Sequence, residues 1–536
     1  MKEQSTTKSF AILSIAGIIA KLLSLVYIPV LTRILNFQMD IYYGLYDIFV
    51  FIYALTNIGM QTAISKYVSE LSAVGNHKDA IRTFKIARGF LIGVGLLCMF
   101  TMLFGANFIA NFMKKPEMAY GIMFLSPAIL TTSILATYKG YFQGRNNMTP
   151  VALASIFEQI ANVFISIFFG FVLVKLGGIE LGSAGATIGT SIGAIIAVLY
   201  LIYMYKILNP EKEARLTQEK SVKRVRTKVI IKVLIAYGLP ITLSSGLQNF
   251  GNIIDLANVQ SRLLAAGFMN SEAREMYALL GQWRTLINIP MIFITSLCIA
   301  LLPVLSKANV LKDKIAMKKN IKFAFRLTYV LAIPSTIGLM ILSKEVYQYL
   351  FGRPNGYEMM IVGGITIILM AIVFVQNIVL QSINKFYFVM YTLVFGLVIK
   401  FISNYILIAI PSINIYGAVI GFIVYFTVVS VINHYKITNV TKIKIRHLTL
   451  IIKPFLASLY MGFGIIVLGM LFTMFIKIED LNTVTGLLYT AMLVVFGVIL
   501  YIQGLITFKA VRKSDIRSVS PRLYNKIPQF IKNRLQ

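Results

Sequence analysis

The chain has 536 residues, of which 58% are hydrophobic and only 13% are charged, and its mean hydropathy is +0.79. This composition indicates a membrane protein and excludes a nucleic-acid-binding or secreted protein. Lysine and arginine outnumber aspartate and glutamate by 51 to 20, which gives a formal net charge of +31. The distribution of these cations along the chain therefore carries information about orientation.

Apolar segments long enough to cross a hydrocarbon layer of about 30 Å as helices recur from residue 11 to residue 508. The sequence predicts an all-α polytopic protein with about fourteen transmembrane helices. The predicted spans are residues 11–35, 44–72, 86–113, 121–141, 150–174, 183–205, 232–260, 277–304, 325–342, 357–381, 386–410, 415–435, 451–476 and 485–508.

The charges are unevenly divided between the two sides of these spans. If the chain starts in the cytoplasm, 38 of the 51 lysines and arginines lie in cytoplasmic segments, nine lie outside and four lie within spans. By the positive-inside rule, this asymmetry predicts that both termini are cytoplasmic. Much of the positive charge is then expected to face anionic lipid headgroups rather than a nucleic acid.

Four pairs of segments resemble each other at separations of 229 to 238 residues, which indicates an internal duplication. Spans 1 to 6 and 7 to 12 would be two parallel six-helix repeats, followed by two C-terminal helices. An even number of spans in each repeat gives both halves the same orientation, as in several transporter folds. The matching segments are 32–35 with 261–264, 63–69 with 300–306, Gln143 and Asn146 with Gln381 and Asn384, and 185–189 with 417–421.

The repeat predicts five regions. An N-terminal six-helix lobe covers residues 1–205, a basic cytoplasmic linker covers 206–231, and a C-terminal six-helix lobe covers 232–436. Helices 13 and 14 occupy 437–508. The last region, 509–536, places apolar residues at helical spacing among cations, which predicts a cytoplasmic amphipathic tail on the membrane surface.

Three cations within predicted spans are candidate substrate-binding residues. Lys21 and Lys400 lie near the middle of spans 1 and 11, and Arg284 lies about seven residues from the outer end of span 8. A cation that faces lipid at the bilayer centre costs about 3 kcal/mol, so such residues normally face the protein interior and often mark a substrate route. A structural ion pair is the alternative for each of them.

Three carboxylates are candidates for ion pairing or for coupling transport to an ion. Asp255 could pair with Arg284 or bind a coupling ion, and Glu158 could offset Lys400 or Lys21. Asp47 lies closer to the end of its span. The sequence does not choose among these pairings, and the coupling ion, Na⁺ or H⁺, stays open.

Proline and glycine mark possible sites of bending and close packing. Pro29, Pro240 and Pro290 lie inside spans 1, 7 and 8, where the loss of a backbone hydrogen bond can kink a helix, so they are candidate hinges. Glycines at 185, 189 and 193, and at 417 and 421, put small faces on the sixth span of each half, where helices can pack closely.

No pattern in the chain indicates catalysis, and the protein is not expected to be an enzyme. The sequence has no phosphate-binding loop and no metal-ligand spacing, and its three histidines are separated. The two cysteines lie in apolar spans, where packing is the expected role. No cofactor or metal is therefore expected.

Several motifs nonetheless resemble a known family. The chain resembles the polysaccharide exporter branch of the multidrug/oligosaccharidyl-lipid/polysaccharide (MOP) superfamily, the branch that contains stage V sporulation protein B and the MurJ-type lipid II flippases. The similarity covers nearly the whole chain. The segments that carry it are Tyr43-Gly44-Leu45-Tyr46, Ala63-Ile64-Ser65-Lys66-Tyr67-Val68-Ser69-Glu70, Tyr141-Phe142-Gln143-Gly144-Arg145-Asn146-Asn147-Met148-Thr149-Pro150 and Ala300-Leu301-Leu302-Pro303-Val304-Leu305-Ser306-Lys307.

The resemblance implies a MATE-like fold and a flippase of the bacterial inner membrane. Its substrate would be an undecaprenyl-pyrophosphate-linked sugar precursor, such as peptidoglycan lipid II or a related cell-wall unit, moved outward by alternating access. Lys21 and Arg284 fall near positions where such flippases carry cavity cations. MurJ-type proteins generally have more arginines there, and span 2 offers no clear counterpart here. The expected partners are this anionic lipid and membrane lipids, with the protein acting as a monomer.

Two other functions remain as alternatives. A cation-coupled multidrug exporter of the MATE type would be expected to place carboxylates, not lysines, at its centre. A membrane glycosyltransferase acting on lipid-linked sugars would need an outward catalytic carboxylate, for which Asp40, Glu272 and Asp480 are the available candidates. A role in sporulation is compatible with the resemblance but is not specified by the residues.

Overall fold

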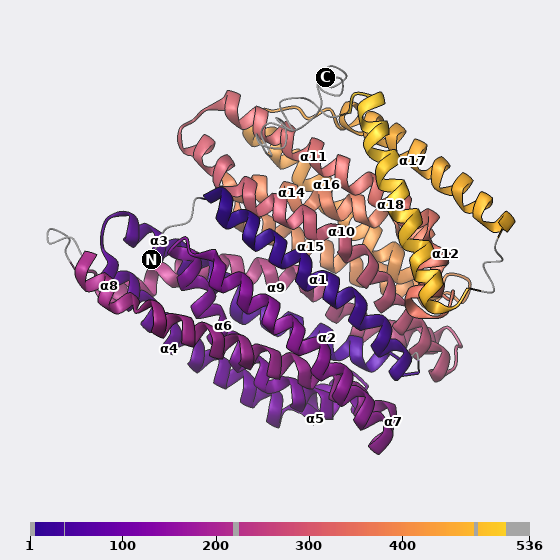
Figure 1. Cartoon of the computed structure of the whole chain (residues 1–536), viewed down its shortest axis with the longest axis horizontal. Coiled ribbons are helices and arrows are strands. Elements are labelled where there is room, and N and C mark those ends of the chain that lie inside the picture. The colour runs from indigo at the N-terminus through magenta and orange to yellow at the C-terminus, as the bar shows by residue number, and fades with distance from the viewer. Residues whose placement is uncertain (1–5, 37, 218–223, 476–480, 511–536) are drawn as a thin grey trace. The chain divides into compact units, whose positions relative to one another are not determined.

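The computed structural model describes residues 6–36, 38–217, 224–475 and 481–510, and at some helical positions it describes only the backbone. Every regular element in these ranges is helical (Figure 1), which confirms the predicted all-α fold. The first part of the chain forms α1 (Thr6–Ile34), α2 (Asp40–Tyr53), the π-helix η1 (Ala54–Ile58), α3 (Gly59–Ala73), α4 (His77–Phe104), α5 (Ala106–Phe112), η2 (Pro116–Met118), α6 (Ala119–Gly144), α7 (Met148–Leu208) and α8 (Pro210–Thr217).

The second part of the chain is also helical. These are α9 (Thr227–Ala265), α10 (Asn270–Val310), α11 (Lys314–Ile341), α12 (Ser343–Glu345), the π-helix η3 (Val346–Phe351), α13 (Tyr357–Gly363), α14 (Ile365–Ser382), α15 (Phe386–Leu407), α16 (Tyr416–Thr441), α17 (His447–Phe475) and α18 (Thr483–Thr507). Each predicted span coincides with one of these helices or with a consecutive pair or group of them.

Eleven spans in the described part of the chain are long and apolar enough to cross a membrane. One of them, the 61-residue α7, holds two predicted spans, 150–174 and 183–205. Its backbone breaks at Gly177 and Gly178, and Gly178 has a φ of 79° that favours glycine. The chain therefore reverses inside α7, while the total of fourteen spans stays a prediction.

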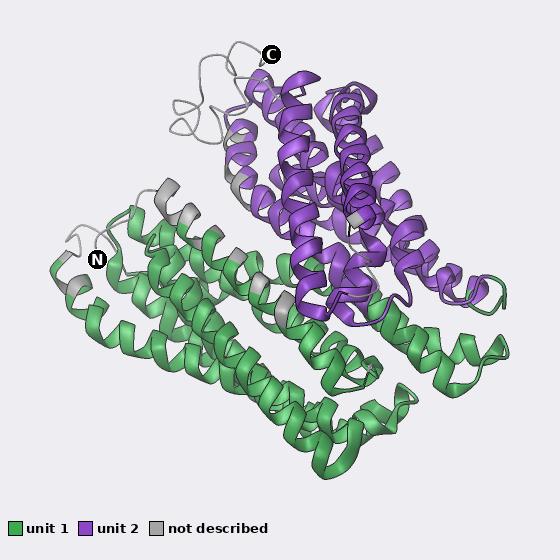
Figure 2. Ribbon diagram, turned by 45° about the vertical axis from the view of Figure 1, so that its right-hand side comes forward, with its two compact units in different colours: residues 1–281, 408–412 green, residues 282–407, 413–536 purple. Residues whose placement is uncertain are grey.

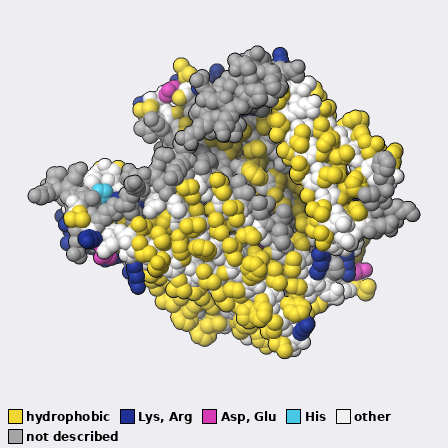
Figure 3. Space-filling model, viewed as in Figure 1, with side chains coloured by type: hydrophobic (Ala, Val, Ile, Leu, Met, Phe, Trp, Pro, Cys, Tyr) yellow, Lys and Arg dark blue, Asp and Glu magenta, His cyan; other side chains and the backbone are white. Residues whose placement is uncertain are grey.

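Many large apolar side chains lie on the surface rather than in the core. On the face shown in Figure 3, hydrophobic side chains cover most of the described surface, and few charged groups interrupt them. On α7, the exposed phenylalanines Phe164, Phe168 and Phe171 recur at helical spacing. In water such a surface would promote aggregation, so the hydrocarbon layer is its natural environment.

The predicted duplication is visible in the backbone conformation at the helix ends. Residues with positive φ recur in the same chain order in both halves, at separations of 231 to 238 residues. Among the described residues from 36 to 442, only Gly356 lacks such a counterpart. The pairs are Asn36 and Gly267, Gly75 and Lys312, Lys114 and Gly352, Asn146 and Asn384, Gly178 and Asn414, and Asn209 and Lys442.

The ends of α6 and α14 show the same similarity in their hydrogen bonds. In each, the asparagine amide donates to the carbonyl three residues earlier, and the next amide donates to the carbonyl five residues before it. The N···O distances are 3.0 and 3.0 Å around Asn146, and 3.0 and 2.9 Å around Asn384. This arrangement satisfies carbonyls at a helix C-terminus, and its recurrence supports two repeats of one ancestral unit.

The starts of α4 and α11 correspond in the same way. The side chain of Asn76 accepts a hydrogen bond from the Asp79 amide at the N-terminus of α4, and Asp313 accepts bonds from two amides at the N-terminus of α11. Asparagine and aspartate are favoured at this position because their side-chain oxygens satisfy amides that have no partner within the helix.

The chain packs as two compact units (Figure 2). Unit 1 contains residues 1–281 and 408–412, and unit 2 contains residues 282–407 and 413–536. In unit 1, α9 packs against α2, η1 and α3. The predicted lobes 1–205 and 232–436 follow the sequence repeat, whereas units 1 and 2 follow the packing of the chain. The boundaries of the units therefore do not test those of the lobes. Residues 511–536, most of the predicted amphipathic tail, lie outside the described residues.

Close packing explains the small faces on the sixth span of the first half. A Cβ atom added to Gly185, Gly189 or Gly193 would lie 2.8, 2.5 or 2.6 Å from a backbone carbonyl oxygen in the first half of α7. In unit 2, a Cβ atom on Gly421 would collide with the Asn404 side chain on α15. Glycine at these positions lets neighbouring helices approach closely.

Candidate functional site

A mostly buried ion pair joins α6 to α7 in unit 1. Lys139 Nζ lies 2.8 Å from Glu158 Oε2, and the two side chains are 13% and 28% exposed. Glu158 was considered as a partner for Lys21 or Lys400, but the described ion pair is with Lys139. Sequence analysis missed this lysine because it lies only five residues before the end of α6, where a cation reads as part of a cytoplasmic boundary.

A second polar cluster lies beside the π-helix η1, in the middle of predicted span 2. The Asn57 side chain is fully buried, donates to Thr132 Oγ1 at 3.0 Å and accepts from Ser133 Oγ at 2.9 Å. A π-helix inserted in a longer helix frequently occurs at a functional site. Sequence analysis did not identify Asn57, since a single asparagine in an apolar segment has no characteristic pattern.

A network of charges ties the start of α2 to η2 and to the start of α10, all within unit 1. Asp40 is 1% exposed, and its Oδ2 lies 3.0 Å from Arg274 Nε and 3.7 Å from Lys115 Nζ. Arg274 also lies 3.5 Å from Glu117. Burial lowers the pKa of Lys115, and the Asp40 carboxylate partly offsets this effect.

Asp47 takes part in a contact adjoining this network. Tyr277 on α10 donates to Asp47 Oδ2 at 2.9 Å, and the same tyrosine ring lies 4.4 Å from Lys115 Nζ. The Asp47 side chain is buried, although the residue lies near the end of its predicted span. The hydroxyl stabilises a carboxylate that has been removed from water.

The remaining candidates lie on α1, α9 and α10. Asp255 on α9 is completely buried, whereas its proposed partner Arg284 belongs to unit 2, so that ion pair stays a prediction. Lys21 belongs to α1, but its side chain lies outside the described part of the structure. Pro29, Pro240 and Pro290 lie within continuous helices, and their role as hinges stays a prediction.

Unit 2 contains two buried cations. Lys400 on α15 is completely buried, and its Nζ lies 3.9 Å from the centre of the Phe422 ring. Arg284 on α10 is 6% exposed and directly follows Trp283, whose ring centre lies 5.5 Å from that of Phe422. The aromatic face stabilises the ammonium group electrostatically. Both cations are therefore removed from lipid and bulk water, and their role as substrate-binding residues stays a prediction.

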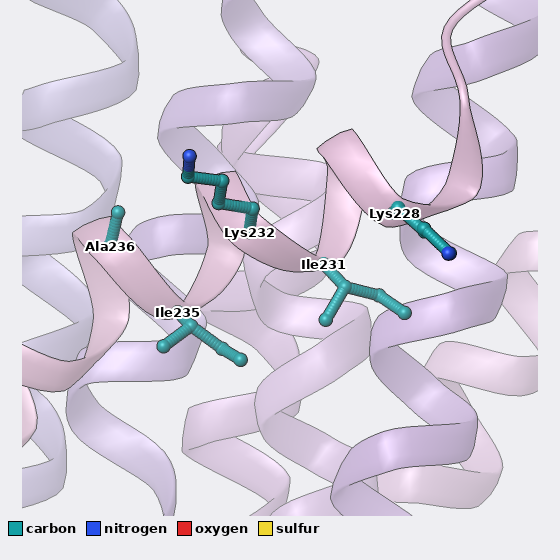
Figure 4. A pocket seen from close by; sticks show the side chains of 5 residues that line it. All are labelled: Lys228, Ile231, Lys232, Ile235 and Ala236. Atoms are coloured by element: carbon teal, nitrogen blue, oxygen red, sulfur yellow. The ribbon is translucent and has the colours of Figure 1, made fainter.

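A shallow surface groove on α9 does not resemble a substrate site. Figure 4 shows that its lining side chains come from a single helix, with Lys228 and Lys232 beside Ile231, Ile235 and Ala236. Exposed apolar and basic residues on one helix are typical of the boundary between the hydrocarbon and the headgroups. Across the described residues, no group of three or more histidine, cysteine, aspartate or glutamate side chains is arranged to hold a metal ion.

The fold, the duplication and the apolar helices together define a multi-pass membrane protein built from two related halves. Two solved structures share this architecture. The inward-facing conformation of a multidrug resistance MATE family transporter matches with a TM-score of 0.61 and 15% identity, over 82% of this chain and 97% of that chain. Lipid II flippase MurJ in an inward closed conformation also gives a TM-score of 0.61 and 15% identity, over 92% and 97%.

The sequence comparisons identify the family. Residues 6–309 match the family model of polysaccharide biosynthesis proteins, and the chain belongs to this family. Stage V sporulation protein B of Bacillus subtilis is 25% identical over 97% of this chain and 98% of its own length. Lipid II flippase MurJ of the same bacterium is 23% identical over 65% and 67%. The predicted resemblance to stage V sporulation protein B and the MurJ-type flippases is thereby confirmed, and the relatives with stated activities are transporters rather than enzymes.

Proposed function

We propose that the protein is a flippase that moves a lipid-linked anionic sugar precursor, of the undecaprenyl-pyrophosphate class, from the inner to the outer leaflet of the bacterial inner membrane. The proposal places both termini in the cytoplasm and treats the protein as a monomer that works by alternating access. The observation that carries it is the burial of Lys400 and Arg284 in a chain that belongs to the polysaccharide biosynthesis family.

Buried cations suit a diphosphate headgroup. Lysine and arginine bind phosphate oxygens through short, charge-assisted hydrogen bonds, and these bonds are stronger where water is excluded. A cation that is costly to bury is best explained by an anion that the protein must hold. In this proposal Arg284, Lys400 and Lys21 bind the diphosphate while the polyprenyl chain stays in lipid.

The membrane potential can supply the driving force. With the cell interior negative, outward movement of an anion releases about 2.3 kcal/mol per charge for each 100 mV. A diphosphate carries more than one negative charge, so export needs no ATP site, and the sequence contains no phosphate-binding loop. In an alternative scheme, Na⁺ or H⁺ binds to Asp255, Glu158 or Asp47 and returns the empty transporter to its inward-facing state.

Transport in proteoliposomes tests this function. Purified protein is reconstituted with a labelled lipid-linked diphosphate sugar, and the label exposed on the trans side is measured over time. Replacement of Arg284, Lys400 or Lys21 by alanine should lower the initial rate at least about tenfold, since each removes one charged contact to the diphosphate. Lys175→Ala removes an exposed lysine and serves as the control. Equal rates in all variants would remove these cations from the mechanism.

Two alternatives predict different results. A multidrug exporter of the MATE type, to which the fold is also similar, would export organic cations and leave the lipid unmoved. A glycosyltransferase needs a free outward carboxylate. However, Asp40 contacts Arg274 and Lys115, Glu272 accepts a hydrogen bond from the Met269 amide at 2.8 Å, and Asp480 lies outside the described residues. The two described carboxylates therefore already have structural roles.

A further inference from the structure

One end of unit 2 contains a strongly basic cavity that the proposed transport function does not use. Its volume is about 540 Å³, and six of its ten lining residues are lysine or arginine. None of these ten described residues is acidic. The lining consists of Lys318, Lys322, Arg326, Lys442, Ile443, Lys444, Ile445, Arg446, Thr449 and Leu450.

Two kinds of backbone bring the cations together. On α11, Lys318, Lys322 and Arg326 are four residues apart, so they lie on one face of the helix. Residues 442–446 connect α16 to α17 without helical structure. Their side chains alternate, with three exposed cations and with Ile443 and Ile445 buried. A helical basic stripe and a non-helical basic stripe therefore line the same cavity.

The walls of this cavity are joined by a chain of hydrogen bonds. His447, the first residue of α17, lies with its Nδ1 2.7 Å from the Tyr329 hydroxyl of α11 and its Nε2 3.0 Å from His434 Nδ1 of α16. The Tyr329 side chain is 1% exposed. These bonds fix the start of α17 directly after Arg446, so the backbone that carries Lys444 and Arg446 is anchored to α11 and α16.

The equivalent place in the first half of the chain carries an internal neutralising charge. Lys85 is the ninth residue of α4 and Lys322 is the ninth residue of α11. Lys85 Nζ lies 2.8 Å from Glu211 Oε1, and Glu211 comes two residues after the left-handed C-cap of α7. Two residues after the left-handed C-cap of α16, the chain has Lys444 instead. The second half thus replaces the carboxylate with another cation.

We propose that this cavity is a binding site for a phosphorylated group with at least two negative charges, separate from the residues assigned to transport. Six cations around one small volume repel each other, and an anion relieves that repulsion. Arginine and lysine together suit phosphate oxygens. The volume is in the range of small-molecule sites.

Two sources can supply this chemistry. The cavity lies where α11 and α17, both candidate membrane spans, begin, which is the depth of lipid headgroups. A headgroup phosphate of an anionic lipid can therefore enter from the bilayer, and a free polyphosphate can enter from the aqueous side. Both would contact the same two basic stripes.

The experiment uses the full chain in nanodiscs and two variants with matched charge. Lys318→Gln with Lys322→Gln removes two cations that line the cavity, whereas Lys314→Gln with Lys319→Gln removes two exposed cations from the same turns of α11 outside the cavity. In zwitterionic nanodiscs, inorganic pyrophosphate is titrated and binding is measured by thermophoresis. In nanodiscs with phosphatidylglycerol, native mass spectrometry counts the lipids that each protein retains.

In at least one of the two measurements, the wild-type chain and the Lys314/Lys319 variant should bind pyrophosphate or phosphatidylglycerol equally well. In that measurement, the Lys318/Lys322 variant should bind at least about tenfold more weakly. Saturable binding of pyrophosphate would assign the site to a soluble ligand, and selective loss of retained phosphatidylglycerol would assign it to a lipid. Equal behaviour of the two variants in both arms would overturn the proposal. Because neither variant changes the transport residues, this failure is distinguishable from a failure of the flippase assay.

Discussion

Lys139 on α6 and Glu158 on α7 form an ion pair in which Nζ lies 2.8 Å from Oε2. The pair is mostly buried, so each charge depends on the other for stabilisation. It joins the fourth predicted span to the fifth, and its members come from positions that hydropathy alone would not associate.

We expect a single substitution at this pair to destabilise the protein more than the double substitution does. Glu158→Gln leaves a mostly buried lysine without its carboxylate and should lower the free energy of unfolding by about 2–4 kcal/mol. The double variant Lys139→Met with Glu158→Leu should recover most of that loss, since an apolar pair needs no charge compensation. Thermal unfolding in detergent of the wild-type chain, Lys139→Met, Glu158→Leu and the double variant gives the coupling energy. Additive losses would show that the two side chains act independently.

The charge network around Asp40 should make the stability of the protein depend on pH. Burial lowers the pKa of Lys115 in the folded protein below its ordinary value of 10.5, so the unfolded chain binds more protons in the interval between these two pKa values. Stability should therefore rise with pH in that interval, up to about 10.5. The measurement is the melting temperature from pH 7 to pH 10.5.

Two substitutions isolate the contribution of Lys115. Lys115→Met should flatten the rise in stability with pH, whereas Lys114→Met, which changes the exposed neighbouring lysine, should retain it. If the slope is the same in both variants and in the wild-type chain, Lys115 is not its source.

The close approach of the two halves of α7 should make Gly189 intolerant of a side chain. A Cβ atom there would lie 2.5 Å from the Asn162 carbonyl oxygen, so Gly189→Ala should destabilise the protein by about 1–3 kcal/mol. Gly93 on α4 has no atom within 4 Å of an added Cβ. Gly93→Ala should therefore be neutral or stabilising, by up to about 1 kcal/mol. The comparison is made by thermal unfolding, and equal effects would contradict the packing argument.

Lys400 should be dispensable for folding and required for transport. Lys400→Met removes a completely buried charge while keeping a similar volume, so the melting temperature should stay the same or rise. If the ammonium group binds the diphosphate, flipping should fall at least about tenfold. A variant that unfolds easily but still transports would assign Lys400 to structure, through its contact with Phe422.

The internal duplication could be predicted from the sequence because it is expressed in short segments whose conformation depends on neighbouring residues. Asn146 and Asn384 end their helices with the same local hydrogen bonds, and that conformation depends on a few neighbouring residues. The reversal inside α7 likewise falls between the predicted spans 150–174 and 183–205, where the backbone breaks at Gly177 and Gly178. In these cases the sequence signal and the structure have the same local cause.

The charged contacts were less accessible because they depend on distant segments. Asp40 meets Arg274 across 234 positions in the chain, and no periodic pattern links the two. Asn57 becomes a functional candidate only because the structure places it in a π-helix and in hydrogen bonds with Thr132 and Ser133 of α6.

By itself, the sequence determined that this is a duplicated, all-helical membrane protein with cations inside its spans, because hydropathy and charge act residue by residue. Only the tertiary structure decided that Glu158 pairs with Lys139, and that two basic stripes with different backbones line one cavity. The physical reason is that a buried charge is stabilised by whichever groups the packed helices bring within a few ångströms, and those groups come from separate parts of the chain.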